Sequence, residues 1–568
     1  MSKRIVVCLS VFLVFAMLFA ACGGGGSSSG GSSSSGGGGS SSSGGSSSSG
    51  GSSAGGSSAA GGGTGGVATH SLDDFVSYKV GVTQWLGRFM QGLSPTESWL
   101  ACDGVFDSIL RVDPASRQIV SDCLEDWYYL DDLTFNMKLK ENIYFSNGAH
   151  ATAEDLLYSY TAILDRNSTQ ESSLGPIIWD QCKVLDEYTV QFKWERPWRV
   201  MENIMIYLLC KEWSTSLADG WEDLAWYYPV GSGQYECTQF ASEDIIIIRA
   251  RDDYWNVAEV GPVYVDEWII QFYRDPATMY MDLEVGELQL AMVAATDYSR
   301  FVHQGGPEDL DMFLLPTGSV MFWSFGFHDR EEWNDKRLRE AVAIGMDWDQ
   351  LGFVCFQDQF TPADSILPPR NPYYFSPGKY EYNPERAKQL LNDAGYGPNN
   401  PLKLYTVLGD SPMYKSLGEN AQFQLGQIGI DIEVVFMDTA SAIQIWNTGG
   451  GNDFFFWYRI TGSATGDAWE ILSGTTLESG STVTRVYDPY FRQLWFDMAY
   501  NTDPAIYGPV IEEIQQYCFD EIIYVPFANH TITIGYDKTV FSEEQLRKFC
   551  YGINMYQLGE LGALSAWD

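Results

Sequence analysis

The sequence predicts an α/β fold, and the clearest evidence lies in the C-terminal half. Residues 401–408 have the pattern of an extended strand, residues 414–428 that of a helix, and apolar residues alternate with others across 430–436. A strand, a helix and a strand at this spacing predict a parallel pair joined by a right-handed crossover. A further helix is expected to begin after Asn383, which can cap it, and to end at Gly395.

The first half of the chain is richer in strand patterns. We expect strands over 135–139, 189–193 and 245–249. One helix is also expected, because Thr152 can cap a first turn in which Asp155 stands three residues later, close to a capping box. Both halves are therefore expected to mix strands and helices.

The first 22 residues predict a secretory signal. Lys3 and Arg4 precede a largely apolar run from Ile5 to Phe19, and two alanines then precede Cys22. The run is shorter than the roughly 20 residues that span a bilayer, so a permanent transmembrane helix is not expected. The small-small-Cys ending resembles a bacterial lipobox, which implies that Cys22 is acylated. The alternative is a plain signal peptide that is cut at the alanine pair.

Residues 23–66 are almost entirely glycine and serine. Such a segment cannot bury apolar surface, so we expect a disordered tether with a span of roughly 35–40 Å. The remaining 67–568 are long enough for two to four domains. With 74 acidic and 34 basic side chains, the formal charge of −40 argues against nucleic acid or anionic lipid as a partner.

Catalytic and metal-binding motifs are missing from the sequence. There is no CxxC, no HExxH pair among the five histidines and no GxSxG, so we expect neither a metal nor a cofactor. Eight cysteines follow Cys22, and in an exported protein they permit disulfides. Eight thiols allow 105 pairings, and the spacing selects none of them.

Several segments, in this order, carry a resemblance to one known family. They are Asp126–Leu139, Phe145–Ser159, Gly231–Tyr235 with Asp253–Asn256, Gly286–Leu290, Phe325–Asp347, Leu367–Pro369 and Tyr382–Tyr396. Together they resemble the solute-binding proteins of ABC importers called family 5, which include the oligopeptide- and dipeptide-binding proteins. The match is distributed over nearly the whole chain after the tether.

The resemblance implies a two-lobed, periplasmic-binding-protein-like fold of type II with an extra inserted subdomain, in which the ligand is enclosed between lobes. Lobe I is expected to comprise 67–110, 226–295 and 525–568. The inserted subdomain would span 111–225, and lobe II would span 296–524. Lobe closure would then present the ligand to a membrane permease, with no catalysis by the protein itself.

Aromatic and polar side chains suit the walls of such a cleft. Our candidates for ligand contact are Gln91, Phe322, Trp323, Trp457, Tyr458, Arg459, Asp467, Trp469, Phe527 and Asn529. Each of these residues is alternatively a core residue. Arg459 can pair with a ligand carboxylate or phosphate, or with a neighbouring acid of the protein.

The expected amine-binding acid of the peptide binders is missing. In these proteins a Trp is followed by an Asp that pairs with the amino terminus of the ligand. Here Trp457 fills the first position, but no acid stands between Ile460 and Ala464. A buried ammonium without a carboxylate costs several kcal/mol. Either Asp467 or another acid replaces it, or the ligand is not a peptide with a free amino group.

The sequence therefore predicts a solute-binding protein of an ABC importer, lipid-anchored at the outer face of the bacterial cytoplasmic membrane, that captures oligopeptides or dipeptides. An oligosaccharide is the alternative ligand in the same fold, because clustered Trp and Tyr also suit the apolar faces of sugars. A receptor that feeds a sensor and a surface-tethered hydrolase are the alternative functions. A glycosidase would need two carboxylates about 5 to 10 Å apart, and acids are too numerous for the sequence to select a pair.

Overall fold

The structure is a computed structural model, and it describes most of the chain from Phe75 onward. The described residues are 75–83, 102, 104–112, 119–164, 174–198, 206–216, 228–241, 244–327, 330–369, 371, 373–438, 441–442, 445, 452–459, 488–501 and 503–549. The chain divides into two compact units, residues 1–64 and 65–568, and every described residue belongs to the second.

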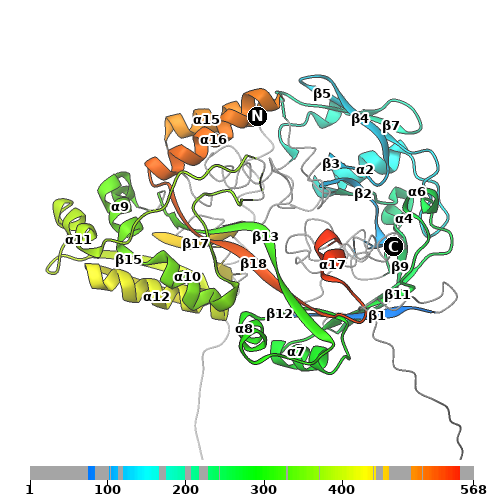
Figure 1. The fold of residues 1–568 in the computed structure, drawn as a ribbon. Coiled ribbons are helices and arrows are strands. Elements are labelled where there is room, and N and C mark those ends of the chain that lie inside the picture. The colour runs from blue at the N-terminus through cyan, green and yellow to red at the C-terminus, as the bar shows by residue number, and fades with distance from the viewer. Residues whose placement is uncertain are drawn as a thin grey trace, which may run out of the picture. The chain divides into compact units, whose positions relative to one another are not determined.

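One mixed sheet combines strands from the beginning, the middle and the end of the described chain (Figure 1). Its strand order is β17 (Phe454–Arg459), β13 (Leu310–Phe325), β18 (Tyr524–Asp537), β12 (Leu290–Val293), β1 (Ser77–Val82), β11 (Glu267–Phe272), β10 (Ile245–Ala250) and β9 (Tyr235–Ala241). A short strand, β14 (Thr361–Pro362), pairs with β18 off this path. Strand β1 is parallel to both of its neighbours, so the first described strand is held inside the sheet.

The two longest strands of this sheet, β13 and β18, run antiparallel beside each other. Their register shifts twice, between Pro316 and Ser319 and between Met321 and Phe322. Irregularities of this kind bend a strand and increase its local twist. The pair links the β12 side of the sheet to the β17 side (Figure 1).

Smaller sheets lie outside the main one. A four-stranded sheet has the order β4 (Leu124–Asp131), β5 (Thr134–Leu139), β7 (Thr189–Lys193) and β6 (Lys183–Val184), and a three-stranded sheet has the order β3 (Ile119–Val120), β2 (Ser108–Val112) and β8 (Ile206–Tyr207). Helix α2 (Ala153–Leu164) packs on the first of these, with Leu156 and Tyr160 in the same core as Phe135 and Phe192. The predicted strands of the first half are therefore confirmed.

The predicted parallel pair is also confirmed. Strands β15 (Leu402–Gly409) and β16 (Ile430–Met437) are parallel, and α12 (Pro412–Ile428) connects them. The helix begins two residues earlier than the pattern predicted, because Ser411 caps it and Pro412 occupies its first turn. Helix α11 (Pro384–Asp393) begins as predicted, with Asn383 accepting a hydrogen bond from the backbone N–H of Arg386.

Of the two hydrogen bonds of the expected capping box at α2, only the one from the backbone of Thr152 to the side chain of Asp155 forms. The carboxylate of Asp155 accepts the backbone N–H of Thr152 at 2.9 Å and the hydroxyl of the same residue at 3.0 Å. The threonine hydroxyl therefore donates to the acid, where the pattern predicted that it would cap the helix itself. The other oxygen of Asp155 accepts the N–H of Lys211 at 2.8 Å, which ties α2 to α4 (Lys211–Ser216).

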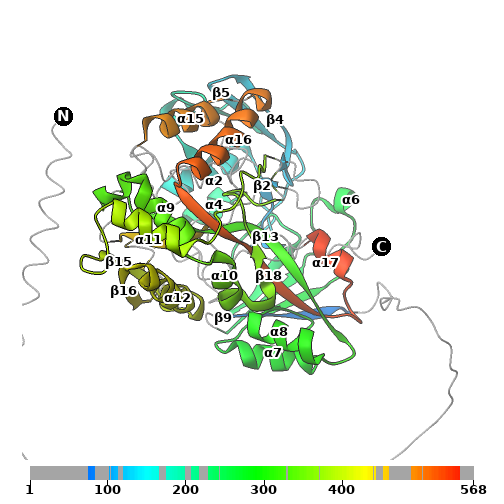
Figure 2. The ribbon, with the colours of Figure 1, turned by 60° about the vertical axis from the view of Figure 1, so that its left-hand side comes forward.

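The remaining helices surround the sheets. Figures 1 and 2 both place α7 (Pro276–Glu284) beside α8 (Ala295–Gln304), Figure 1 shows them next to β12, and Figure 2 shows α10 and α11 near α12. The other helical elements are α6 (Val257–Val260), α9 (Lys336–Gly345), α10 (Trp348–Phe356), α15 (Pro489–Ala499), α16 (Pro504–Asp520), α17 (Glu543–Phe549) and the short 3-10 turns at 179–181, 331–334 and 357–359. None of the helices in the described ranges has the length and apolarity of a membrane span.

Two hydrophobic cores meet at the β17 end of the main sheet. Val320 and Phe322 belong to a core that also contains residues of the smaller sheets and of α15 and α16. Met321, Trp323 and Phe325 belong to a second core, built with α9 to α12. Since successive side chains of a strand point to opposite faces, β13 separates the two cores.

Candidate functional site

Three neighbouring strands bring together seven of the ten residues predicted to contact ligand. Phe322 on β13 lies opposite Trp457 on β17 and Pro526 on β18, and Val320 lies opposite Arg459 and Asn529 in the same way. Trp323, Tyr458 and Phe527 occupy adjacent positions on these strands. The backbone of the candidate site is thus a continuous piece of the main sheet.

Three of these side chains are deeply packed. Phe322, Trp323 and Phe527 are about 1%, 0% and 1% exposed. The ring of Trp323 stacks on Phe454 with centroids 3.8 Å apart, while Phe322 meets Tyr524 edge-on at 4.9 Å. In this conformation they stabilise the cores on both sides of the strands, and their contact with a ligand stays a prediction.

Asn529 has an unused hydrogen-bond acceptor. Its side chain is 9% exposed, and its Nδ2 donates to the carbonyl of Pro362 at 2.7 Å. Its Oδ1 is buried and has no partner among the described residues. Leaving a buried acceptor unpaired costs about 1–3 kcal/mol, so a ligand N–H that reached it would gain a favourable bond.

Polar contacts hold the segment next to this asparagine. The side chain of Gln359 donates to the hydroxyl of Thr533 at 2.8 Å, and the hydroxyl of Thr531 donates to the carbonyl of Gln359. On the other side of the same 3-10 turn, Asp358 accepts from Ser299 on α8 and lies 3.2 Å from His303. The turn therefore connects α8 with the middle of β18.

The remaining candidates lie outside the described residues. They are Gln91, Asp467, Trp469 and the lipidation candidate Cys22. For Trp457, Tyr458 and Arg459 the backbone is described and the side chains are not. Within the described ranges no three His, Cys, Asp or Glu side chains are grouped so that they could hold a metal ion.

Six cysteines of the described residues are free thiols and form no disulfide: Cys123, Cys182, Cys210, Cys237, Cys355 and Cys518. Burial raises the pKa of the Cys123 and Cys518 thiols well above the usual value, which keeps both in the neutral form. Cys550 lies outside the described residues.

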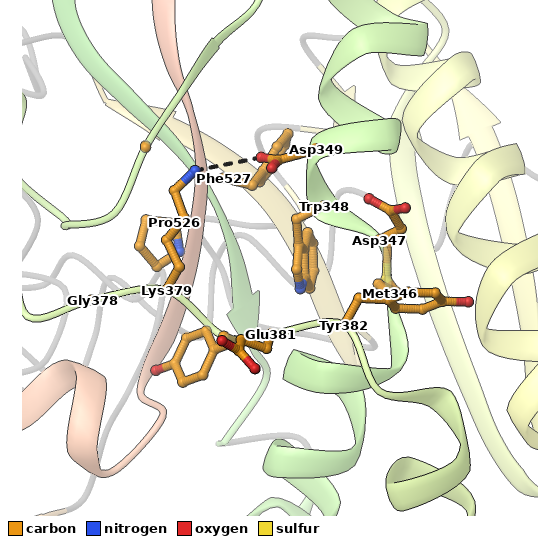
Figure 3. A pocket seen from close by; sticks show the side chains of 12 residues that line it. Met346, Asp347, Trp348, Asp349, Gly378, Lys379, Glu381, Tyr382, Pro526 and Phe527 are labelled. Carbon is orange, nitrogen blue, oxygen red and sulfur yellow. Dashed lines mark ion pairs between the residues drawn. The ribbon is translucent and has the colours of Figure 1, made fainter.

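Sequence reasoning missed a pocket of about 390 Å³ next to Phe527 (Figure 3). It is bounded by the start of α10, by residues 378–382 and by Pro526 and Phe527 of β18. No sequence pattern could have found it, because residues 378–382 have no periodicity and stand well over a hundred positions from β18. The one available signal was aromatic enrichment in these segments.

The arrangement of these elements defines the class of protein. The structure is a mixed α/β fold of the periplasmic-binding-protein class, similar to the ABC transporter substrate-binding protein CtaP from Listeria monocytogenes, with a TM-score of 0.72 and 18% identity over 86% of this chain and 99% of that chain. The family model of bacterial extracellular solute-binding proteins, family 5 Middle, matches residues 118–482, and the chain belongs to this family.

Two relatives show how far the sequence similarity extends. Di/tripeptide-binding protein 2 of Pseudomonas aeruginosa (strain UCBPP-PA14) is 23% identical over 454 residues, which cover 75% of this chain and 84% of that protein. Glutathione-binding protein GsiB of Escherichia coli (strain K12) is 25% identical over 344 residues, 59% of this chain and 65% of that protein.

The predicted family and fold class are thereby confirmed. The protein is an extracytoplasmic solute-binding component of ABC import, and it acts by binding and not by catalysis. This membership sets aside the alternative of a surface-tethered hydrolase.

Proposed function

We propose that this protein captures oligopeptides or dipeptides and delivers them to a membrane permease. The observation that carries the proposal is the similarity to a di/tripeptide-binding protein along three quarters of the chain. The relative named for glutathione, itself a small peptide, is consistent with it. Because the usual amine-binding acid is missing between Ile460 and Ala464, we expect another acid, such as Asp467, to pair with the amino terminus.

The ligand would lie against the face of the sheet on which Phe322 is found. Asn529 supports this placement, because its buried Oδ1 has no partner among the described residues and every peptide bond but one to proline offers an N–H. Trp457 and Arg459 occupy the register positions next to Phe322 and Val320. An aromatic residue and a cation at these positions suit a peptide side chain and a peptide carboxylate.

Closure would take place by bending of the segments that cross between the lobes. We place lobe I at 67–110, 226–295 and 525–568, the inserted subdomain at 111–225 and lobe II at 296–524, so that the chain crosses between lobe I and lobe II near 295 and near 524. Strand β13 of lobe II and β18 of lobe I pair across this boundary, and their two register shifts, at Pro316 to Ser319 and at Met321 to Phe322, bend the sheet there. A ligand that contacts both lobes then shifts the population toward the closed form.

A peptide ligand is expected to stay bound during purification and to make the protein more compact. Native mass spectrometry of the purified protein, with peptide and oligosaccharide mixtures added, identifies the ligand, and small-angle scattering measures the radius of gyration with and without it. A retained peptide with an unchanged radius would contradict the closure mechanism. A retained sugar would replace the proposed ligand and leave the family unchanged.

We also propose that Cys22 is acylated and that residues 23–66 tether the binding unit to the outer face of the membrane. A flexible tether raises the local concentration of the protein beside its permease. Replacing Cys22 with serine is expected to release the protein into the culture medium and to remove the mass of the lipid. Cys8→Ser is the matched control and should stay in the membrane fraction. Equal retention of both variants would contradict lipidation at Cys22.

A further inference from the structure

The pocket beside α10 is lined mainly by the start of α10, by residues 378–382 and by the beginning of β18. Phe527 and Trp348 belong to the core built with α9 to α12, with ring centroids 5.6 Å apart, whereas Phe322 belongs to the other core. The pocket volume of about 390 Å³ is in the usual range for small-molecule sites. Most of the aromatic lining thus belongs to the core built with α9 to α12, while Ala363 belongs to the core of Phe322, so competition with the solute is the test of whether the two sites are separate.

The walls of the pocket combine aromatic rings with carboxylates. Its lining residues are Met346, Asp347, Trp348, Asp349, Ala363, Gly378, Lys379, Tyr380, Glu381, Tyr382, Pro526 and Phe527. Figure 3 shows the indole of Trp348 in the middle of this group, with the three acids around it. Three carboxylates and one ammonium give the lining a formal charge of −2.

The charges are not equally available to a ligand. Asp349 lies 3.6 Å from the ammonium of Lys379, so this pair largely neutralises itself. Asp347 uses Oδ1 to accept the N–H of Gln350 at 2.9 Å, and its other oxygen has no hydrogen-bond partner in the described part of the chain. Glu381 makes neither a hydrogen bond nor an ion pair with any described residue. Two carboxylates thus remain to bind a cation.

The aromatic residues are held in place by the protein itself. The indole N–H of Trp348 donates to the carbonyl of Ala343 at 2.7 Å, and the hydroxyl of Tyr380 donates to the carbonyl of Phe519 at 2.8 Å. The ring of Tyr380 also stacks on Phe519. Their polar atoms are therefore satisfied, and what they can offer a ligand is mainly ring surface. Ring surface next to carboxylates favours an organic cation, through cation–π attraction and ion pairing.

We propose that this pocket is a second ligand site, which binds a small organic cation: a primary amine or guanidinium on an aromatic or aliphatic body. The cationic group pairs with Asp347 or with Glu381, and the apolar body lies against Trp348 and Tyr382. Pro526 and Phe527 of the lining lie on the same strand as Asn529, three and two residues before it.

Phenethylamine is the probe, and 2-phenylethanol is its neutral counterpart. Isothermal titration calorimetry with the purified protein is expected to show saturable binding of phenethylamine that weakens with added salt, and much weaker binding of the alcohol. No binding of the amine, or equal binding of the two compounds, would overturn the proposal.

Removing acids of the lining and removing its lysine are expected to change phenethylamine affinity in opposite directions. The double variant Asp347→Asn with Glu381→Gln is expected to weaken phenethylamine binding about tenfold, and asparagine keeps the helix cap. Lys379→Met removes the one base of the lining and is expected to tighten binding by about two- to fivefold. Glu385→Gln, an exposed acid outside the pocket, is the control and should change nothing. Unchanged affinity in both pocket variants would overturn the proposed site.

The same variants separate this site from the solute cleft. Retention of the solute by native mass spectrometry is expected to be equal in the wild type and in the double variant. Competition between the retained solute and phenethylamine would show one shared site and would overturn the proposal of a second one. If the retained solute is not a peptide, the peptide proposal fails, but phenethylamine is still expected to bind to the pocket beside α10.

Discussion

Replacing Trp323 with alanine is expected to lower the free energy of unfolding by about 3–5 kcal/mol, as for other buried aromatic residues. The indole is fully buried and is surrounded by the rings of Phe454, Phe456 and Trp348. Truncation would leave a cavity at the junction of β13 and β17, because neighbours on paired strands cannot collapse into the space.

Urea or thermal unfolding of the Trp323→Ala variant measures this effect. The matched control is Phe353→Ala on α10, because its ring is 59% exposed and should cost well under 1 kcal/mol. A small loss of stability in Trp323→Ala, with a large loss of solute affinity, would assign this side chain to the ligand wall. The converse result would assign it to the core.

The stability of the protein is expected to depend on pH through Asp107. Burial is the main cause that raises the pKa of this carboxyl to about 7, and the nearby charge of Asp122 adds to it. The carboxyl accepts hydrogen bonds from Trp255 at 2.8 Å and from Tyr254 at 3.0 Å, which oppose the shift. In the described residues no Lys or Arg side chain pairs with it.

The direction in which stability changes with pH follows from the raised pKa of Asp107. The folded protein holds this proton more tightly than the unfolded chain, so the stabilisation is complete below about pH 4 and is lost as the pH rises through 7. Raising the pKa from 3.8 to about 7 corresponds to on the order of 4 kcal/mol of stability. The two arginines near this site bind other groups and not Asp107. Arg111 pairs with Asp122 at 2.9 Å, and Arg251 donates to the carbonyl of Gly233 and pairs with Asp253.

Asp107→Asn is expected to flatten this part of the pH profile and to be more stable than the wild type at pH 8. The amide can still accept from Trp255 and can donate to the hydroxyl of Tyr254. Denaturant titrations from pH 4 to pH 8 measure the difference, with the exposed Asp252→Asn as the control. Parallel profiles for the wild type and Asp107→Asn would contradict the prediction.

Much of the secondary structure could be predicted because its causes are local. Asn383 caps α11 with its own side chain, and Asp155 reaches only three residues back to Thr152. The alternation over 430–436 and the helix before it also predicted a parallel pair correctly. Each of these signals depends on neighbours within one or two turns of the chain, so no tertiary contact was needed to see them.

The candidate site could be predicted only in part. The register that places Phe322 opposite both Trp457 and Pro526 joins segments that are far apart in the sequence. A strand pattern shows that successive residues face opposite sides, but it does not show what covers each side. For the same reason the pocket around Trp348 and Glu381 had no signal of its own.

The sequence by itself determined the family, the α/β class and the expectation of export, because motif order, periodicity and the composition of a leader are properties of the chain in one dimension. Only the tertiary structure decided that Trp323 and Phe527 are buried in one core while Phe322 is buried in another. It also decided that Asn529 has an unpaired acceptor and that the carboxylates of Asp347 and Glu381, which make no ion pair within the described residues, lie beside Trp348. Burial and hydrogen bonding depend on which distant segments pack together, and that is settled only when the chain folds.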